Sequence, residues 1–97
     1  MKEGPASVLL RLFTHPACAG CGPVVKSAWE LHEAFKGRFE LKTISLETKP
    51  GLDEAFAQGI KTIPTILLFV EGVEVERIIG APAAGQLEQT LQKILNP

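Results

Sequence analysis

The chain has little of several residue types, and each shortage excludes a class of protein. Among 97 residues it contains two cysteines, one tryptophan and no tyrosine. Two cysteines are too few for the disulfide framework of a small secreted scaffold, and they cannot complete a tetrahedral zinc site within one chain. Ten basic residues against eleven acidic ones, without a run of like charge, exclude the basic footprint of a nucleic-acid or anionic-membrane binder. No apolar stretch approaches the length of a membrane span.

The length and the first residues set further expectations. Ninety-seven residues predict a single domain, 1–97, with a core of its own. Residues 1–7 lack the charged start of a secretory signal, and the apolar run that follows is short and interrupted by Arg11. We therefore expect a cytoplasmic protein, where a closely spaced cysteine pair is more often catalytic or metal-binding than structural.

The two cysteines lie three positions apart, as Cys18 and Cys21, with Ala19 and Gly20 between them. This spacing lets the sulfurs close a small disulfide ring and reopen it. One thiol can then attack the disulfide of a partner, while the other resolves the mixed disulfide. An apolar run precedes the pair and a helical pattern follows it, so we predict that the pair lies at a strand-to-helix junction.

Hydrophobic periodicity predicts an α/β fold in the order β-α-β-α-β-β-α. The expected strands span 8–13, 39–46, 65–70 and 73–79, and the expected helices span 23–35, 48–58 and 83–95. A helix between the first two strands makes them parallel neighbours, and the last two form a hairpin. A four-stranded mixed sheet with helices on both faces accounts for every element.

Some side chains carry separate expectations. Trp29 is expected in the core, and His32 is expected to be packed or half-exposed at the margin of its helix. The short second helix is expected to place Leu52, Ala55 and Phe56 on one side.

The segment 59–69, followed by 70–72 and 79–81, resembles the second half of thioredoxin. With the cysteine pair after the first strand, it makes the chain from about residue 8 resemble the thioredoxin superfamily, at the size of a glutaredoxin. The resemblance implies a thioredoxin-like three-layer sandwich and a thiol–disulfide oxidoreductase that needs no bound cofactor or metal. It implies protein disulfides as substrates, a reductase or a low-molecular-weight thiol as electron donor, and a monomer.

The resemblance also implies a role for single residues. Pro64 matches the cis-proline of the family, whose loop faces the cysteines, and the turn exposes the backbone of Ile63 for pairing with an extended substrate segment. Gly80 matches a small residue that lets the partner approach. Phe13 and Phe69 are expected in the core.

Two assignments of the attacking sulfur remain open. Cys18 matches the attacking position of the family, because it lies five positions after Phe13, and Cys21 then resolves. Alternatively, residues 21–24 resemble the Cys-Gly-Pro-Cys of thioredoxin with Val24 in place of the second cysteine, so that Cys21 attacks and Cys18 resolves. We favour Cys18, since the second register makes the loop after Phe13 three residues too long.

The chain departs from the family at Ala17, where thioredoxins have tryptophan, and at Leu12, where they bury an acid. His15 can hydrogen-bond the attacking sulfur, or it can be an ordinary loop residue. The competing function is a binding module that docks extended peptides at Pro64, or a dimer whose four thiolates hold zinc or an iron–sulfur cluster.

Overall fold

The computed structural model describes residues 7–96 and contains four strands and three helices in the predicted order. The elements are β1 (Val8–Thr14), α1 (Cys21–Ala34), β2 (Glu40–Ser45), α2 (Lys49–Ala57), β3 (Thr65–Val70), β4 (Val73–Ile79) and α3 (Gln86–Leu95). The bounds of β3 and β4 agree with the prediction to the residue, because a buried apolar run and a turn at 71–72 delimit them.

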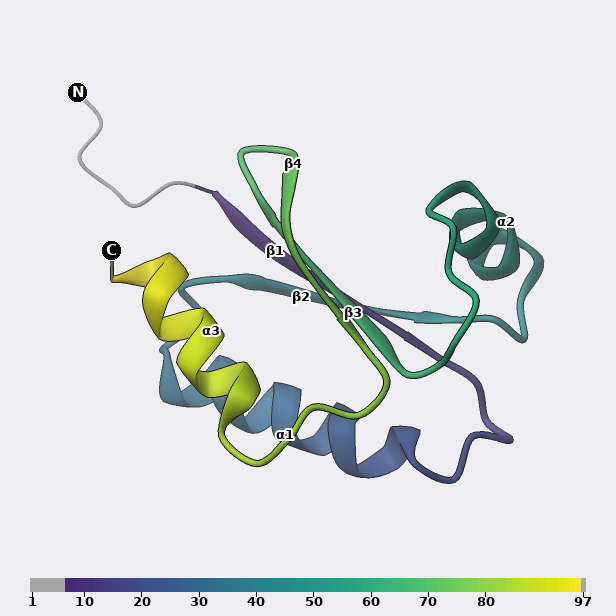
Figure 1. The fold of residues 1–97 in the computed structure, drawn as a ribbon, viewed down its shortest axis with the longest axis horizontal. Coiled ribbons are helices and arrows are strands. Elements are labelled where there is room, and N and C mark those ends of the chain that lie inside the picture. The colour runs from purple at the N-terminus through teal and green to yellow at the C-terminus, as the bar shows by residue number, and fades with distance from the viewer. Residues whose placement is uncertain (1–6, 97) are drawn as a thin grey trace.

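The strands form one mixed sheet in the order β2-β1-β3-β4. Strand β1 is parallel to β2 and antiparallel to β3, and β3 and β4 form the predicted hairpin. Helices α1 and α3 lie together on one face of the sheet, while α2 lies on the other face near the end of β1 (Figure 1). The three-layer α/β sandwich predicted from the sequence is confirmed.

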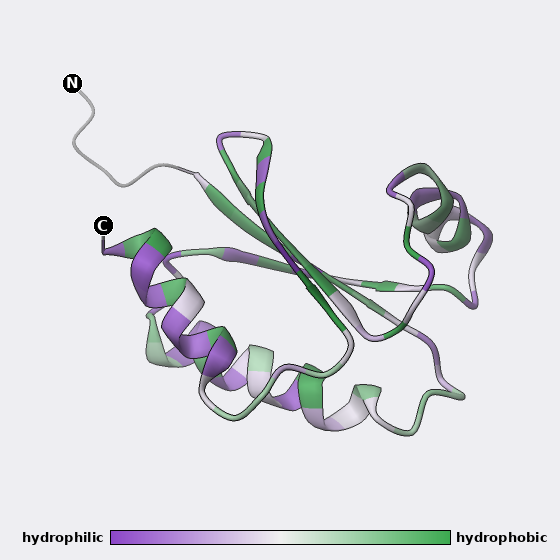
Figure 2. Ribbon diagram, viewed as in Figure 1, coloured by the Kyte–Doolittle hydropathy of each residue, from purple (hydrophilic) through white to green (hydrophobic). Residues whose placement is uncertain are grey.

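Each face of the sheet carries its own group of buried side chains. The larger core, on the side of α1 and α3, contains Leu10, Leu12, Ile66 and Leu68 from the central strands together with Ala28, Leu87 and Leu91 from the helices. The smaller core, on the side of α2, contains Phe13, Ile44, Ala55 and Leu67. Figure 2 shows that hydrophobic residues concentrate in the central strands, while hydrophilic and hydrophobic residues alternate along α3. Successive side chains of β1 therefore point into the two cores in turn.

The predicted starts of two helices were wrong. Helix α1 begins at Cys21, after Gly20 as its N-cap, and not at Pro23. Proline is tolerated through the first turn, where N–H groups have no partner within the helix, so its presence alone could not fix the first residue. Helix α3 begins at Gln86 rather than three residues earlier, because Gly85 adopts a positive φ of 78°. Strand β2 is one residue shorter at each end than predicted.

The prediction that Trp29 lies in the core was also wrong. The residue is 46% exposed, whereas its neighbour Ala28 is fully buried and faces the sheet. The Trp29 ring packs edge-on against His32 at 5.5 Å between centroids, and His32 packs in the same manner on buried Phe39 at 5.3 Å. Trp29 thus lies at the margin of the apolar stripe of α1, and His32 is half-buried, as expected.

Two further apolar side chains are more exposed than the pattern of α2 suggested. Of the three residues expected on one side of that helix, only Ala55 is buried, while Leu52 is exposed and Phe56 is 86% exposed. Phe69 is only partly buried, although Phe13 is fully buried as expected. The α2 face of the sheet is therefore incompletely covered.

Candidate active site

Cys18 and Cys21 form a disulfide at the junction of β1 and α1, with 5.4 Å between their Cα atoms. The loop before them is closed by a hydrogen bond from the Cys18 N–H to the His15 carbonyl oxygen at 2.9 Å. Cys21 is the first residue of α1 and is only 3% exposed, whereas Cys18 precedes the helix and is partly exposed. The two sulfurs therefore differ in access to a partner.

The start of α1 favours negative charge on sulfur. Among the described residues, no side chain caps this helix at Gly20, and its first turn contains no acidic residue. The positive end of the helix dipole is consequently available to a thiolate. A helix N-terminus stabilises a thiolate in general, and the Cys18–Cys21 pair lies at the start of α1.

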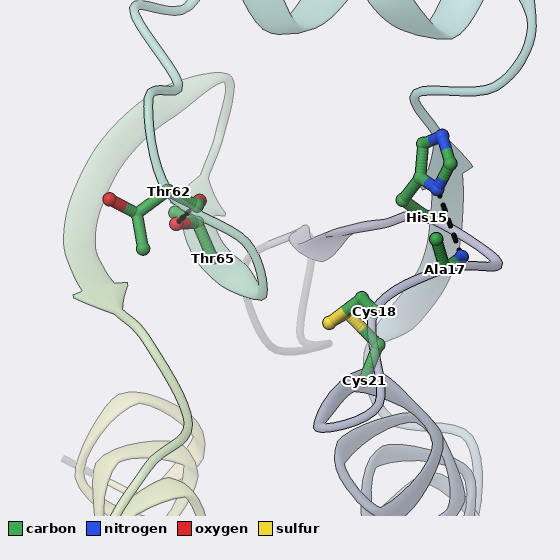
Figure 3. The surroundings of a disulfide bond; sticks show 6 residues. All are labelled: His15, Ala17, Cys18, Cys21, Thr62 and Thr65. Carbon is green, nitrogen blue, oxygen red and sulfur yellow. Dashed lines mark hydrogen bonds between the residues drawn. A yellow bond between two sulfur atoms is a disulfide. The ribbon is translucent and has the colours of Figure 1, made fainter.

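The loop around Pro64 lies across from the disulfide. The Ile63–Pro64 peptide bond is cis, and Pro64 is buried. Figure 3 shows the sulfur atoms pointing toward the loop that carries Thr62 and Thr65. The Pro64 carbonyl oxygen accepts a hydrogen bond from the Gly80 N–H at 2.8 Å, which ties this loop to the end of β4. The structure thus brings together the cysteine pair, Pro64 and Gly80, which lie far apart in sequence.

Gly80 leaves space beside this loop. Its φ is 85°, a conformation that side chains of L-residues rarely adopt, and a Cβ built on it would meet no atom within 4 Å. Ile63 is partly buried and packs against the smaller core, so contacts of its side chain with this core hold its backbone in place.

Thr65 contributes a contact that the sequence reasoning missed. It is only 2% exposed, and its hydroxyl donates a hydrogen bond to the Thr62 carbonyl oxygen, across the cis-proline. A threonine directly after a proline and at the start of a buried strand is a signal that could have indicated this bond, since a buried hydroxyl needs a partner.

His15 lies beside the disulfide but is engaged elsewhere. Its Nδ1 accepts a hydrogen bond from the Ala17 N–H at 3.0 Å, and its ring points away from the sulfur atoms (Figure 3). An accepting Nδ1 places the proton of the neutral ring on Nε2. The structure gives His15 a contact that shapes the loop, and the hydrogen bond to the attacking sulfur stays a prediction.

Comparison with known proteins agrees with this geometry. A family model described as thioredoxin matches residues 3–93. The chain belongs to the thioredoxin family. It is 31% identical over 83 residues to a thioredoxin of Synechocystis sp., a match that covers 86% of this chain and 76% of the relative. It is 34% identical over 84 residues to the chloroplastic M-type thioredoxin of Chlamydomonas reinhardtii, covering 87% of this chain and 59% of the relative.

Solved thioredoxin structures share the fold. The oxidized thioredoxin O2 of Arabidopsis thaliana superposes with a TM-score of 0.84 at 15% identity, covering 94% of this chain and 77% of the other. A mutant thioredoxin from Halobacterium salinarum gives 0.81 at 23% identity, covering 95% of this chain and 78% of the other.

Membership of the thioredoxin family, together with the disulfide, makes this chain a thiol–disulfide oxidoreductase that acts on protein disulfides. Cys18 and Cys21 are its redox-active pair. Two residues near the pair depart from the thioredoxin pattern. Leu12, in place of an acid, is fully buried in the larger core, and Ala17, in place of tryptophan, is exposed beside the pair.

Two kinds of feature are absent from residues 7–96. No group of three or more His, Cys, Asp or Glu residues in that range lies close enough to hold a metal ion. Likewise, no helix within it is both long and apolar enough to cross a membrane.

Proposed function

We propose that Cys18 supplies the attacking thiolate of this thioredoxin-family reaction and that Cys21 resolves the intermediate. The observation that carries the proposal is the difference in burial: Cys21 is 3% exposed at the first position of α1, while Cys18 is partly exposed outside the helix. A substrate disulfide must approach the attacking sulfur from solvent, so the accessible sulfur is the one that can attack first.

The reaction transfers two electrons to the substrate. The Cys18 thiolate attacks one sulfur of the substrate disulfide, that S–S bond breaks, and the other substrate sulfur leaves as a thiolate that takes a proton from water. The Cys21 thiolate then attacks the Cys18 sulfur of the mixed disulfide. The second substrate thiolate leaves, and the Cys18–Cys21 disulfide forms. The first thiolate is favoured by the positive end of the α1 dipole, whose first turn contains no acidic residue.

Substrate positioning falls to the loop opposite the sulfurs. The carbonyl oxygen of Pro64 is already bonded to the Gly80 N–H, whereas the backbone groups of Ile63 have no hydrogen bond within residues 7–96 and can pair with an extended segment. The open space beside Gly80 admits the substrate backbone. These roles are the ones that the family resemblance implies for Ile63, Pro64 and Gly80.

The electron donor, the oligomeric state and the location complete the proposal. We propose re-reduction by a reductase or a low-molecular-weight thiol, a monomer, and a cytoplasmic location. The near-neutral composition, with ten basic and eleven acidic residues, supports neither a nucleic acid nor an anionic membrane as partner.

Trapping of the mixed disulfide tests the assignment of the sulfurs. Cys21→Ser should accumulate a stable mixed disulfide through Cys18 with an oxidised substrate such as insulin, because the resolving thiol is missing. Cys18→Ser should trap no substrate and should fail to reduce insulin. Trapping through Cys21 in Cys18→Ser, or preferential alkylation of Cys21 at low pH in the reduced wild type, would overturn it.

The same preparations address the competing function. A dimer that shares a metal predicts zinc or iron–sulfur absorbance in the purified protein, with dimerisation that a chelator abolishes. That result without insulin reduction would contradict the proposed reaction.

A further inference from the structure

A cavity of about 680 Å³ lies between α1 and the loop that joins β4 to α3. We call it the α1 groove. Figure 1 shows this loop, 81–85, running along α1 before α3 begins. The volume falls in the range of about 300–1,000 Å³ that is typical of binding sites, and it suits a few residues of extended chain.

The α1 groove begins at the redox site. Its lining includes Gly20, which lies between the two cysteines, and Pro23 in the first turn of α1. The opposite wall begins at Ala81, directly after Gly80, whose N–H is bonded to the Pro64 carbonyl. A substrate strand that is held at Ile63 and bonded to Cys18 therefore has this groove on one side of its path.

The lining combines small, apolar side chains with two carboxylates. The loop wall is Ala-Pro-Ala-Ala-Gly, without a charged or large side chain, and Val24 and Leu87 add apolar surface. Glu30 and Glu88 are the charged residues among the described residues that line the groove. Both are exposed, and neither has an ion-pair partner within residues 7–96.

We propose that the α1 groove binds the segment next to the target disulfide in protein substrates and favours lysine or arginine over acidic residues there. The carboxylates of Glu30 on α1 and Glu88 on α3 attract a basic side chain, whose alkyl part packs on the small residues of the loop while its charged end stays near the carboxylates. An acidic segment meets like charge and is disfavoured. The inference rests on the proposed function, because it extends the substrate path that starts at Cys18.

A pair of matched peptides tests it. Each carries one cysteine in a disulfide with a chromophoric thiol, flanked by alanine and either two lysines or two glutamates, and a third peptide carries serines. With reduced wild type at low ionic strength, the lysine peptide should react about 3- to 10-fold faster than the glutamate peptide. The ratio should fall toward about 1 in roughly 0.5 M salt, because exposed charges are screened.

Charge variants locate the effect. The double variant Glu30→Gln/Glu88→Gln should lower the lysine-to-glutamate ratio to below about 2 at low salt. Glu33→Gln removes one charge from the same helix outside the groove and should keep the wild-type ratio. An equal fall in Glu33→Gln would mean that net charge alone produces the preference, and it would overturn the proposal.

A structural measurement keeps the two proposals apart. In a mixed disulfide of Cys21→Ser with the lysine peptide, the amide signals of Ser27 and Gly85, which line the groove, should shift. The protein could reduce the serine peptide, react with the lysine and glutamate peptides at equal rates, and show no shift of these amide signals. That result would overturn binding in the α1 groove and leave the proposed reaction standing. No reduction of any peptide would instead overturn the proposed reaction.

Discussion

The two faces of the sheet differ in how much they bury. Twelve buried residues form the larger core beneath α1 and α3, and four form the smaller core beneath α2. The smaller core nevertheless adjoins the cis-proline loop: Phe13 is paired with Thr65 in the sheet, and Ile63 packs against this core. We infer that the larger core supplies most of the stability, whereas the smaller core mainly supports the cis-proline loop.

Neighbouring leucines of β3 provide the sharpest test of this comparison. Leu68 faces the larger core and Leu67 the smaller core, and both are fully buried. Leu68→Ala should lower the free energy of unfolding by about 3–4 kcal/mol, because the closed core cannot collapse into the cavity. Leu67→Ala should cost about 2–3 kcal/mol, since the partly exposed neighbours of its core can relax.

Urea unfolding measures the loss of unfolding free energy in each variant. The rate of insulin reduction, normalised to the folded fraction, measures how far each variant disturbs the site. Leu67→Ala should slow reduction because the support of Ile63 is weakened, while Leu68→Ala should not. If insulin reduction is slowed by Leu68→Ala and not by Leu67→Ala, the roles of the two cores are the reverse of those inferred here.

Much of the fold was predictable because its signals are local. Strands β1 and β3 are largely apolar runs whose side chains are mostly buried, and turn residues delimit β3 and β4. Whether an apolar side chain is buried depends on which other element of the fold packs against it. This tertiary property was not predictable from local patterns. Trp29 and Phe56 fit the apolar stripes of their helices, yet both are exposed because no element of residues 7–96 packs over them.

The same division holds at the site. The spacing of Cys18 and Cys21, and the position of Pro64 before β3, identified the chemistry from the sequence. The contact of His15 with the Ala17 N–H and the α1 groove depend on the paths of two loops, which no periodicity describes. Both became visible only in three dimensions.

Arg11 tests how the open part of the α2 face is stabilised. Its guanidinium lies 4.6 Å from the Phe69 ring centroid and 3.2 Å from the Glu54 carboxylate, and its Nε is buried without a hydrogen-bond partner within residues 7–96. Arg11→Ala should cost about 1 kcal/mol, mainly through lost packing on Phe69. Arg11→Met keeps that packing and removes the unpaired donor, so its unfolding free energy should stay within about 0.5 kcal/mol of wild type. A large loss in Arg11→Met would show that the ion pair, not packing, stabilises this face.

Glu74 on the edge strand β4 gives a smaller effect with a defined pH dependence. Its carboxylate accepts hydrogen bonds from Arg77 at 2.8 and 3.0 Å, and these bonds hold its pKa below the usual range. A lowered pKa stabilises the fold above the unfolded-state pKa, and the contribution is lost as the pH falls through the folded-state value. Glu74→Gln should therefore cost about 0.5 kcal/mol at about pH 7, as for an exposed ion pair, and less at about pH 3, where more of the carboxylate is protonated. Denaturant unfolding at the two pH values measures the difference, and an equal cost at both would exclude the carboxylate charge as its cause.

Phe56 should give the smallest effect of all, although it is an aromatic residue on a helix that covers the sheet. With 86% of it exposed, Phe56→Ser removes almost no buried area, so the free energy of unfolding should change by less than about 0.5 kcal/mol. Ala55→Ser at the buried neighbouring position is the matched control, and it should cost more because it places a hydroxyl against the smaller core. If urea unfolding shows that Phe56→Ser costs more than Ala55→Ser, the ring is covered in solution, and the α2 face is more closed than its four buried residues indicate.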